Sequence, residues 1–144
     1  MIETNLKKIS GLIHQLLSTV PRDKLTDAVI FGSSAITLNG RDLQRPIDDL
    51  DLFVSETAYD RLKKGATEVE KKPGVVALQV GVPSVEILKT FPGVQYADVL
   101  LRAASTKDSQ GLRVAAIEDL LTWKRAEGRP KDLEDLRKID TEHQ

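Results

Sequence analysis

The chain has 144 residues, of which 40% are hydrophobic and 30% charged, and its formal net charge is -1. This length and composition suit one compact domain and argue against overall disorder. Such a small net charge attracts no polyanion over a distance, so any nucleic-acid contact must come from a local patch. The absence of cysteine excludes disulfides, thiolate zinc sites and thiol nucleophiles.

The sequence also lacks the features of a membrane or secreted protein. No apolar run approaches the ~20 residues that span a bilayer. The N-terminus carries charges in an amphipathic pattern instead of a signal-peptide core. We therefore predict a cytoplasmic protein that makes no membrane contact.

The first third of the chain predicts a helix, a buried strand and a second helix. Apolar residues recur at helical spacing over residues 4–20, which is typical of an amphipathic helix. The apolar run at 28–31 predicts a short buried strand. A helix over 33–38 follows, with Gly40 at its C-terminal cap.

A second strand, predicted over 47–54, carries two carboxylates. Because side chains alternate along a strand, Asp49 and Asp51 should point to one face. Two like charges so placed destabilise the fold unless a positive partner lies between them. Divalent cations prefer carboxylate oxygens, so the pair predicts a metal site. Asp48 is interpreted as a strand-start residue, with contact to the metal or substrate as the alternative.

The rest of the chain predicts alternating short elements. Ser55 is a candidate N-cap for a helix that reaches Lys64. Residues 75–80 and 85–88 predict a hairpin-like pair of strands around a Gly-Val-Pro turn. The remaining predicted elements are a helix over 94–104 with Ala97, Leu100 and Leu101 inward, a strand over 112–114, and helices over 117–125 and 132–139.

These elements predict an α/β (α+β) fold, with a mixed β-sheet flanked by helices and a C-terminal helical segment. We expect a single domain over 1–144, with its core at about 22–115 and its C-terminal helices at about 116–140.

Three features carry the candidate chemistry. Gly32 and Ser33 occupy a strand-to-helix turn, where the backbone can approach a phosphate and N–H groups and hydroxyls bind anions. Ser34 is a further candidate for that role. The aspartate pair suits a divalent metal. Glu86, on a later strand, is either a third metal ligand and base or a solvent-facing glutamate. Together these parts suit metal-assisted phosphoryl or nucleotidyl transfer.

In these motifs the chain resembles the polymerase-β-like nucleotidyltransferase superfamily. The family signature is Gly-Ser at a strand-to-helix turn, an acid–apolar–acid–apolar strand, and a third acid on a neighbouring strand. Here these are Gly32-Ser33, then Asp49-Leu50-Asp51-Leu52, then Glu86, where the family more often has aspartate. The run from 111 to 136 is similar to the tail of small bacterial members, including the much longer AbiE-type toxins of toxin–antitoxin pairs.

The resemblance covers roughly 28–139 and implies a nucleotidyltransferase-type fold. It also implies transfer of a nucleoside monophosphate from a nucleoside triphosphate to a hydroxyl of RNA, a protein or a small molecule. An antitoxin is a candidate partner. The implied catalytic residues and ligands of one or two Mg²⁺ ions, or Mn²⁺, are Asp49, Asp51 and Glu86, and the implied phosphate contacts are Gly32, Ser33 and Ser34.

The C-terminal helices add candidate nucleotide-binding residues. In those relatives the positions that match Lys124 and Asp132 lie near the nucleotide. Lys124 is predicted to meet the triphosphate as a mobile point charge. Arg129 and Lys131 would add positive charge, and Asp132 would orient one of them. The alternative is an exposed helix–turn–helix with surface charge pairs. Trp123 is predicted to be a core or interface residue.

Two interpretations compete with an enzyme. One is a non-catalytic module of the same fold that binds a nucleotide or a partner chain. The other is a structural or oligomeric domain whose acids are solvated, in which Asp49→Asn would be neutral or stabilising.

Overall fold

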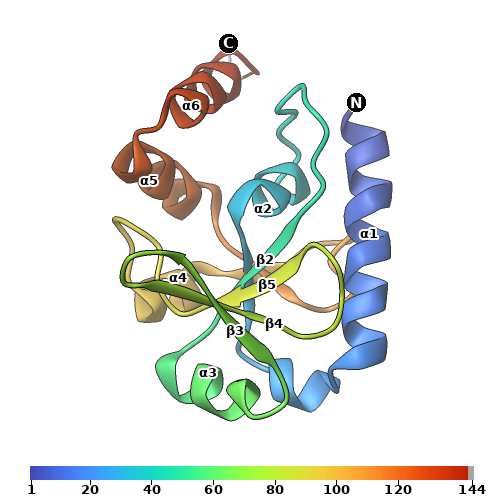
Figure 1. Ribbon diagram of the computed structural model, residues 1–144. Helices are drawn as coiled ribbons and strands as arrows, with labels where there is room; N and C mark the ends of the chain where they lie inside the picture. Colours follow the sequence, from blue (N-terminus) through green and yellow to red (C-terminus); the bar gives the residue numbers. More distant parts are fainter. Residues whose placement is uncertain (143–144) are drawn as a thin grey trace.

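Figure 1 shows the computed structural model, which describes residues 1–142, as a mixed sheet covered by helices. The helices are α1 (Ile2–Thr19), α2 (Gly32–Leu38), α3 (Glu56–Lys63), α4 (Tyr96–Arg102), α5 (Ile117–Glu127) and α6 (Pro130–Glu142), with a short 3₁₀ helix at Arg22–Leu25. The strands are β1 (Val29–Phe31), β2 (Leu50–Phe53), β3 (Thr67–Lys72), β4 (Val75–Gln79), β5 (Val85–Leu88), β6 (Ala104–Ser105) and β7 (Arg113–Val114). The predicted mixed α/β fold with a C-terminal helical segment is confirmed.

The seven strands run in the order β3-β4-β5-β2-β1-β7-β6. β2 pairs in parallel with β5, and β1 pairs in parallel with β7, whereas the other neighbours are antiparallel. Helices α1 and α2 contact the central strands, and α5 bridges α2 and α6 (Figure 1). The sheet therefore places β1, β2 and β5 at its centre.

Local sequence signals account for several elements. The buried side of α1 carries Ile9, Leu12, Ile13 and Leu16, the helical spacing that the sequence predicted. Ser55 caps α3 as expected, because its side chain accepts a hydrogen bond from the Ala58 backbone N–H. The predicted hairpin is confirmed as the antiparallel pair β4–β5.

Three predictions need correction. The strand over 47–54 is shorter, since β2 begins at Leu50 and Asp49 lies just before it. The helix over 94–104 begins at Tyr96 and buries Val99, while Leu101 is 82% exposed and Ala97 is exposed too. Its inward stripe follows the spacing from Tyr96 through Val99 and Leu100 to Ala103.

The third correction is a strand that the sequence did not predict. Strand β3 reads Thr-Glu-Val-Glu-Lys-Lys and is almost wholly exposed. It lies at the edge of the sheet, where charged side chains discourage pairing with another chain. β3 lacks the alternation of apolar and polar residues that identifies a half-buried strand, so the sequence pattern did not predict it.

Aromatic rings join the helical segment to the sheet. Phe31 and Trp123 have ring centroids 5.3 Å apart, and Phe31 and Phe91 have centroids 4.4 Å apart. Phe91 also contacts Phe53 edge-on at 4.9 Å. Trp123 is 5% exposed, so its prediction as a core residue is confirmed. This cluster fixes α5 against β1 and β2, immediately behind the candidate site.

Truncation of the cluster should therefore destabilise the fold. We expect Phe91→Ala to lower the free energy of unfolding by about 3–5 kcal/mol, because it removes a buried ring and leaves a cavity. Urea denaturation measures this change. The control Leu101→Ala, on an exposed side chain, should stay within about 0.5 kcal/mol of wild type. Equal effects of the two substitutions would contradict the cluster's role.

Candidate active site

Two acidic side chains meet where the parallel strands β2 and β5 pair. Asp51 of β2 lies directly opposite Glu86 of β5 in the strand register. Directly paired residues point to the same face of a sheet, so the two carboxylates are neighbours. Asp49 precedes Asp51 by two positions, and all three border the same clefts. We call Asp49, Asp51 and Glu86 the acid trio.

The Gly32-Ser33 turn lies directly against this trio. Phe31, the last residue of β1, is paired with Asp51, and Gly32 follows with a φ of +71°. A Cβ at Gly32 would lie 3.0 Å from Asp51 Oδ2. Glycine is therefore needed at this position both for its left-handed backbone and for the close approach of the carboxylate.

The acid trio has an excess of negative charge. Burial, and after it the charges of Glu86 and Asp49, raise the pKa of Asp51 to about 7, while Lys71 and Lys131 oppose the shift. An ionised Asp51 is thus costly in the protein alone. A nearby cation would lower this cost, and the divalent metal ion that the sequence predicted stays a prediction.

Lys71 supplies one cation to the trio, and the sequence analysis missed it. Its Nζ lies 2.8 Å from Glu86 Oε1 and 3.1 Å from Oε2. The β3–β4 register shifts between Glu70 and Lys72, which makes Lys71 the extra residue of a β-bulge. A bulge re-aims a side chain and often lies beside an active site. The sequence signal was hidden because β3 itself went unpredicted.

The two serines of the turn differ in their surroundings. Ser33 borders the cleft, and its Oγ accepts a hydrogen bond from Arg45 Nη2 at 3.0 Å. Ser34 is 1% exposed, and its hydroxyl donates to the backbone carbonyl of Asp49. Ser33 is thus placed for contact with a ligand, whereas Ser34 ties the turn to the acid trio.

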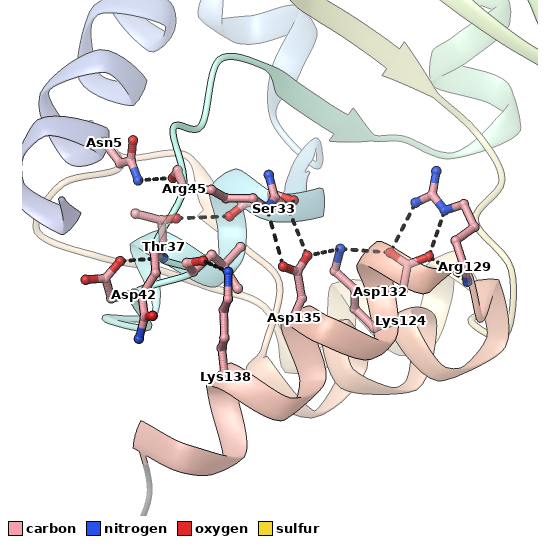
Figure 2. A network of polar contacts seen from close by, with 12 residues as sticks. Asn5, Ser33, Thr37, Asp42, Arg45, Lys124, Arg129, Asp132, Asp135 and Lys138 are labelled. Carbon is pink, nitrogen blue, oxygen red and sulfur yellow. Dashed lines mark hydrogen bonds and ion pairs between the residues drawn. The ribbon is translucent and has the colours of Figure 1, made fainter.

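A buried polar network continues from Ser33 into the C-terminal helices (Figure 2). Arg45 Nη2 lies 2.8 Å from Asp135 Oδ2, and Lys124 Nζ lies 2.8 Å from the same carboxylate oxygen. Lys124 Nζ also lies 3.0 Å from Asp132 Oδ1. Arg129 completes the network with its Nε at 2.7 Å from Asp132 Oδ2.

The network corrects the exposed-surface alternative for Lys124 and Asp132, because both side chains are fully buried. Burial alone would raise the pKa of Asp132, but hydrogen bonds from Arg129 and Lys124 hold it at about 2. Burial alone would likewise raise the pKa of Asp135, but hydrogen bonds from Arg45 and Lys124 outweigh burial, so that this pKa is lowered. Lys124 is therefore held by two ionised carboxylates, and its contact with a triphosphate stays a prediction.

Arg45 and Asp135 are site residues that the sequence analysis missed. Asn5 of α1 fixes the backbone around Arg45, since its amide donates to the Arg45 carbonyl and its Oδ1 accepts from the Ile47 N–H. The sequence offered one signal for Arg45, because this cation lies between the Gly32-Ser33 turn and the aspartate strand in the chain. Its partner Asp135 lies 90 positions away, so sequence spacing gave no indication of the pair.

The acid trio borders two clefts. The larger has a volume of about 860 Å³ and extends from Ser33 toward the C-terminal helices. Its basic lining residues are Arg45, Lys71, Lys72, Lys124, Arg129 and Lys131. The smaller has a volume of about 510 Å³ and extends toward β3 and β4. Asp48 was predicted as a strand-start residue, but β2 begins two positions later, at Leu50. It borders the larger cleft, and its Oδ1 lies 3.8 Å from Lys8 Nζ.

The trio offers oxygen ligands of the kind that Mg²⁺ prefers. Within residues 1–142, however, no three His, Cys, Asp or Glu side chains are grouped closely enough to hold a metal ion. In this structure the Glu86 carboxylate is paired with the Lys71 ammonium group instead of being grouped with the two aspartates. The donor type and excess negative charge of the trio fit a divalent cation, and Glu86 must release Lys71 to complete the site.

No protein-family model and no curated protein matches this chain. Over the described residues, none of the helices combines the length and the apolar character needed to cross a bilayer.

The raised pKa of Asp51 predicts a specific pH dependence of stability. The folded-state pKa of about 7 lies above the ordinary value of 3.8, so wild-type stability should fall as pH rises from 4 through 7. Asp51→Asn removes this effect. Its stability relative to wild type should increase by up to about 4 kcal/mol between pH 4 and pH 8.

Urea denaturation without divalent cations measures the difference at each pH. Asp98→Asn, on an exposed helical position, serves as the control and should show no such trend. A constant difference between Asp51→Asn and wild type would contradict the assignment.

The buried network predicts a large cost for loss of its lysine. We expect Lys124→Met to lower the free energy of unfolding by about 3–5 kcal/mol, because two buried carboxylates lose their shared cation. The exposed Lys107 provides the matched control, and Lys107→Met should change stability by less than about 0.5 kcal/mol. A cost below about 1 kcal/mol for Lys124→Met would show that the network tolerates this loss.

Proposed function

We propose that this protein is a metal-dependent nucleotidyltransferase of the polymerase-β-like type. It would transfer a nucleoside monophosphate from a nucleoside triphosphate to an acceptor hydroxyl. The observation that carries the proposal is the contact between Gly32 and the Asp51 carboxylate, which sets a phosphate-binding turn beside an acid trio in need of a cation. A triphosphate substrate agrees with the predicted cytoplasmic location.

The larger cleft suits the triphosphate. Gly32 and Ser33 offer backbone N–H groups and a hydroxyl at the start of α2. Arg45 already reaches Ser33 and is held by Asp135, so it would meet a phosphate without further ordering. A guanidinium group binds phosphate through paired N–H donors. Lys131, which borders the cleft, would add positive charge at the open side.

The acid trio would hold one or two Mg²⁺ ions, or Mn²⁺. Such an ion, when bound, neutralises the triphosphate and stabilises the attacking and leaving oxygens. Asp51 would supply oxygen ligands from a strand that is paired on both sides. Asp49, just before this strand, would add its own. Glu86 would join them once Lys71 releases it.

The reaction is a substitution at the α-phosphorus. The acceptor oxygen forms a bond to phosphorus while the bond to the pyrophosphate oxygen breaks, and pyrophosphate leaves with that electron pair. The proton of the acceptor hydroxyl passes to the Glu86 carboxylate, which lies beside Asp51 on the neighbouring strand. Lys71, freed from Glu86, remains close to the reacting charges at the border of both clefts.

A second candidate function is a non-catalytic module of the same fold that binds a nucleotide or a partner chain such as an antitoxin. The ion pair of Lys71 with Glu86 favours it, because a glutamate kept on a lysine would neither bind metal nor accept a proton. The two candidates differ in turnover. A toxin role beside an antitoxin is compatible with either one and rests on the family resemblance alone.

Transfer of label distinguishes the candidates. The protein is incubated with Mg²⁺, α-labelled nucleoside triphosphates and mixed RNA, protein and small-molecule acceptors. We expect labelled acceptor with wild type and a loss of at least 100-fold with Asp51→Ala, since the carboxylate holds the metal. Asp98→Ala should retain wild-type activity, because Asp98 is exposed on α4 and borders neither cleft.

Equal labelling by wild type and Asp51→Ala would refute the proposed function. Nucleotide binding without turnover in every acceptor mixture would support the binding module instead.

A further inference from the structure

We propose that the smaller cleft is the acceptor site and that it selects a small, hydroxyl-bearing molecule without phosphate, such as a sugar or amino sugar. This inference rests on the proposed nucleotidyl transfer and adds the class of acceptor to it. Four residues border both clefts: Asp49, Asp51, Lys71 and Glu86. The acid trio thus lies where the two clefts adjoin.

The position of the acid trio indicates which cleft would bind the triphosphate and which the acceptor. The larger cleft holds the phosphate-binding turn and the basic side chains, so it takes the triphosphate. In-line substitution requires the attacking oxygen and the leaving pyrophosphate on opposite sides of the α-phosphorus. With the pyrophosphate in the larger cleft and the α-phosphorus at the trio, the acceptor hydroxyl would approach from the smaller cleft, which shares the trio.

The lining of the smaller cleft indicates the kind of acceptor. Beyond the four shared residues, its walls are uncharged and consist of Thr67, Gln79, Gly81, Val82, Pro83, Ser84 and Val85. Its one cation, Lys71, is paired with Glu86. Nucleic-acid sites neutralise successive phosphates with Lys and Arg, and this cleft offers no such series. Its volume of about 510 Å³ is that of a small-molecule pocket.

A polar row across four strands leads from the smaller cleft to the trio. Thr67 pairs with Gln79 across β3 and β4, and Gln79 pairs with Glu86 across β4 and β5. Glu86 in turn pairs with Asp51. Directly paired residues share one face, so the hydroxyl and amide groups of the row extend the acid site outward. Such groups donate to and accept from sugar hydroxyls.

Ser84 adds a strained backbone to the same wall. Its φ is +67°, a left-handed value that favours glycine. The Ser84 carbonyl accepts a hydrogen bond of 2.8 Å from the Leu50 N–H, between Asp49 and Asp51 in the chain. This hydrogen bond connects Ser84, which borders the smaller cleft, to the segment that carries Asp49 and Asp51. Glycine would adopt this backbone with less strain, whereas serine adds a hydroxyl to a residue that borders the smaller cleft.

The experiment measures transfer of α-labelled nucleotide to three separate acceptor classes: hexoses and amino sugars, total RNA, and protein. The variants are Gln79→Leu and Ser84→Gly. The matched control is Gln95→Leu, at an exposed position before α4 whose side chain makes no cap hydrogen bond. Nucleotide binding is measured separately by calorimetry with Mg²⁺.

We expect label in the sugar class, with KM for the sugar raised about tenfold in each cleft variant by loss of one hydrogen bond. Nucleotide affinity should not change, and Gln95→Leu should match wild type. Ser84→Gly should also raise the thermal midpoint, because glycine relieves the strained backbone.

Label in RNA or protein alone, or an unchanged sugar KM in both cleft variants, would overturn the acceptor assignment while leaving the transferase intact. Absence of label in all three classes would overturn both proposals together.

Discussion

The parallel pairing of β2 with β5 is the constraint on which the candidate site depends. It sets Asp51 opposite Glu86 on one face of a buried sheet, and β1 on the other side brings Gly32 against Asp51. The result is a buried concentration of negative charge, in which burial first and then the charges of Glu86 and Asp49 raise the pKa of Asp51 to about 7. A fold optimised for stability alone would avoid this arrangement. The excess charge therefore supports the proposed cation site.

Two cationic systems surround this charge and act differently. Lys71, on the exposed edge strand, pairs with Glu86 and is aimed there by a β-bulge. Lys124 is fully buried and holds Asp132 and Asp135, and Asp135 positions Arg45 against Ser33 (Figure 2). The first system is exposed enough to exchange with a metal ion. The second is a buried support that connects the C-terminal helices to the Gly32-Ser33 turn, so those helices border the candidate site as well as the core.

Much of this arrangement followed from local sequence patterns, and the rest depends on distant contacts. The Gly32-Ser33 turn and the Asp49/Asp51 pair were predicted because each is defined by adjacent residues. Lys71 was missed because its strand is polar at every position but one. Arg45 was missed because its role comes from Asp135, which only the packing of α6 brings near. The burial of Lys124 was unexpected for the same reason, since its two carboxylates lie on the following helix.

The central claim is that the acid trio binds a divalent cation. Titration of the full chain with Mn²⁺ at pH 8, followed by electron paramagnetic resonance of the free ion, tests it most directly. The account predicts one or two bound ions per chain, with binding abolished in Asp51→Asn, retained in Asp98→Asn and tightened in Lys71→Met, where Glu86 has no competing ammonium group. Equal Mn²⁺ binding by wild type and Asp51→Asn would contradict it.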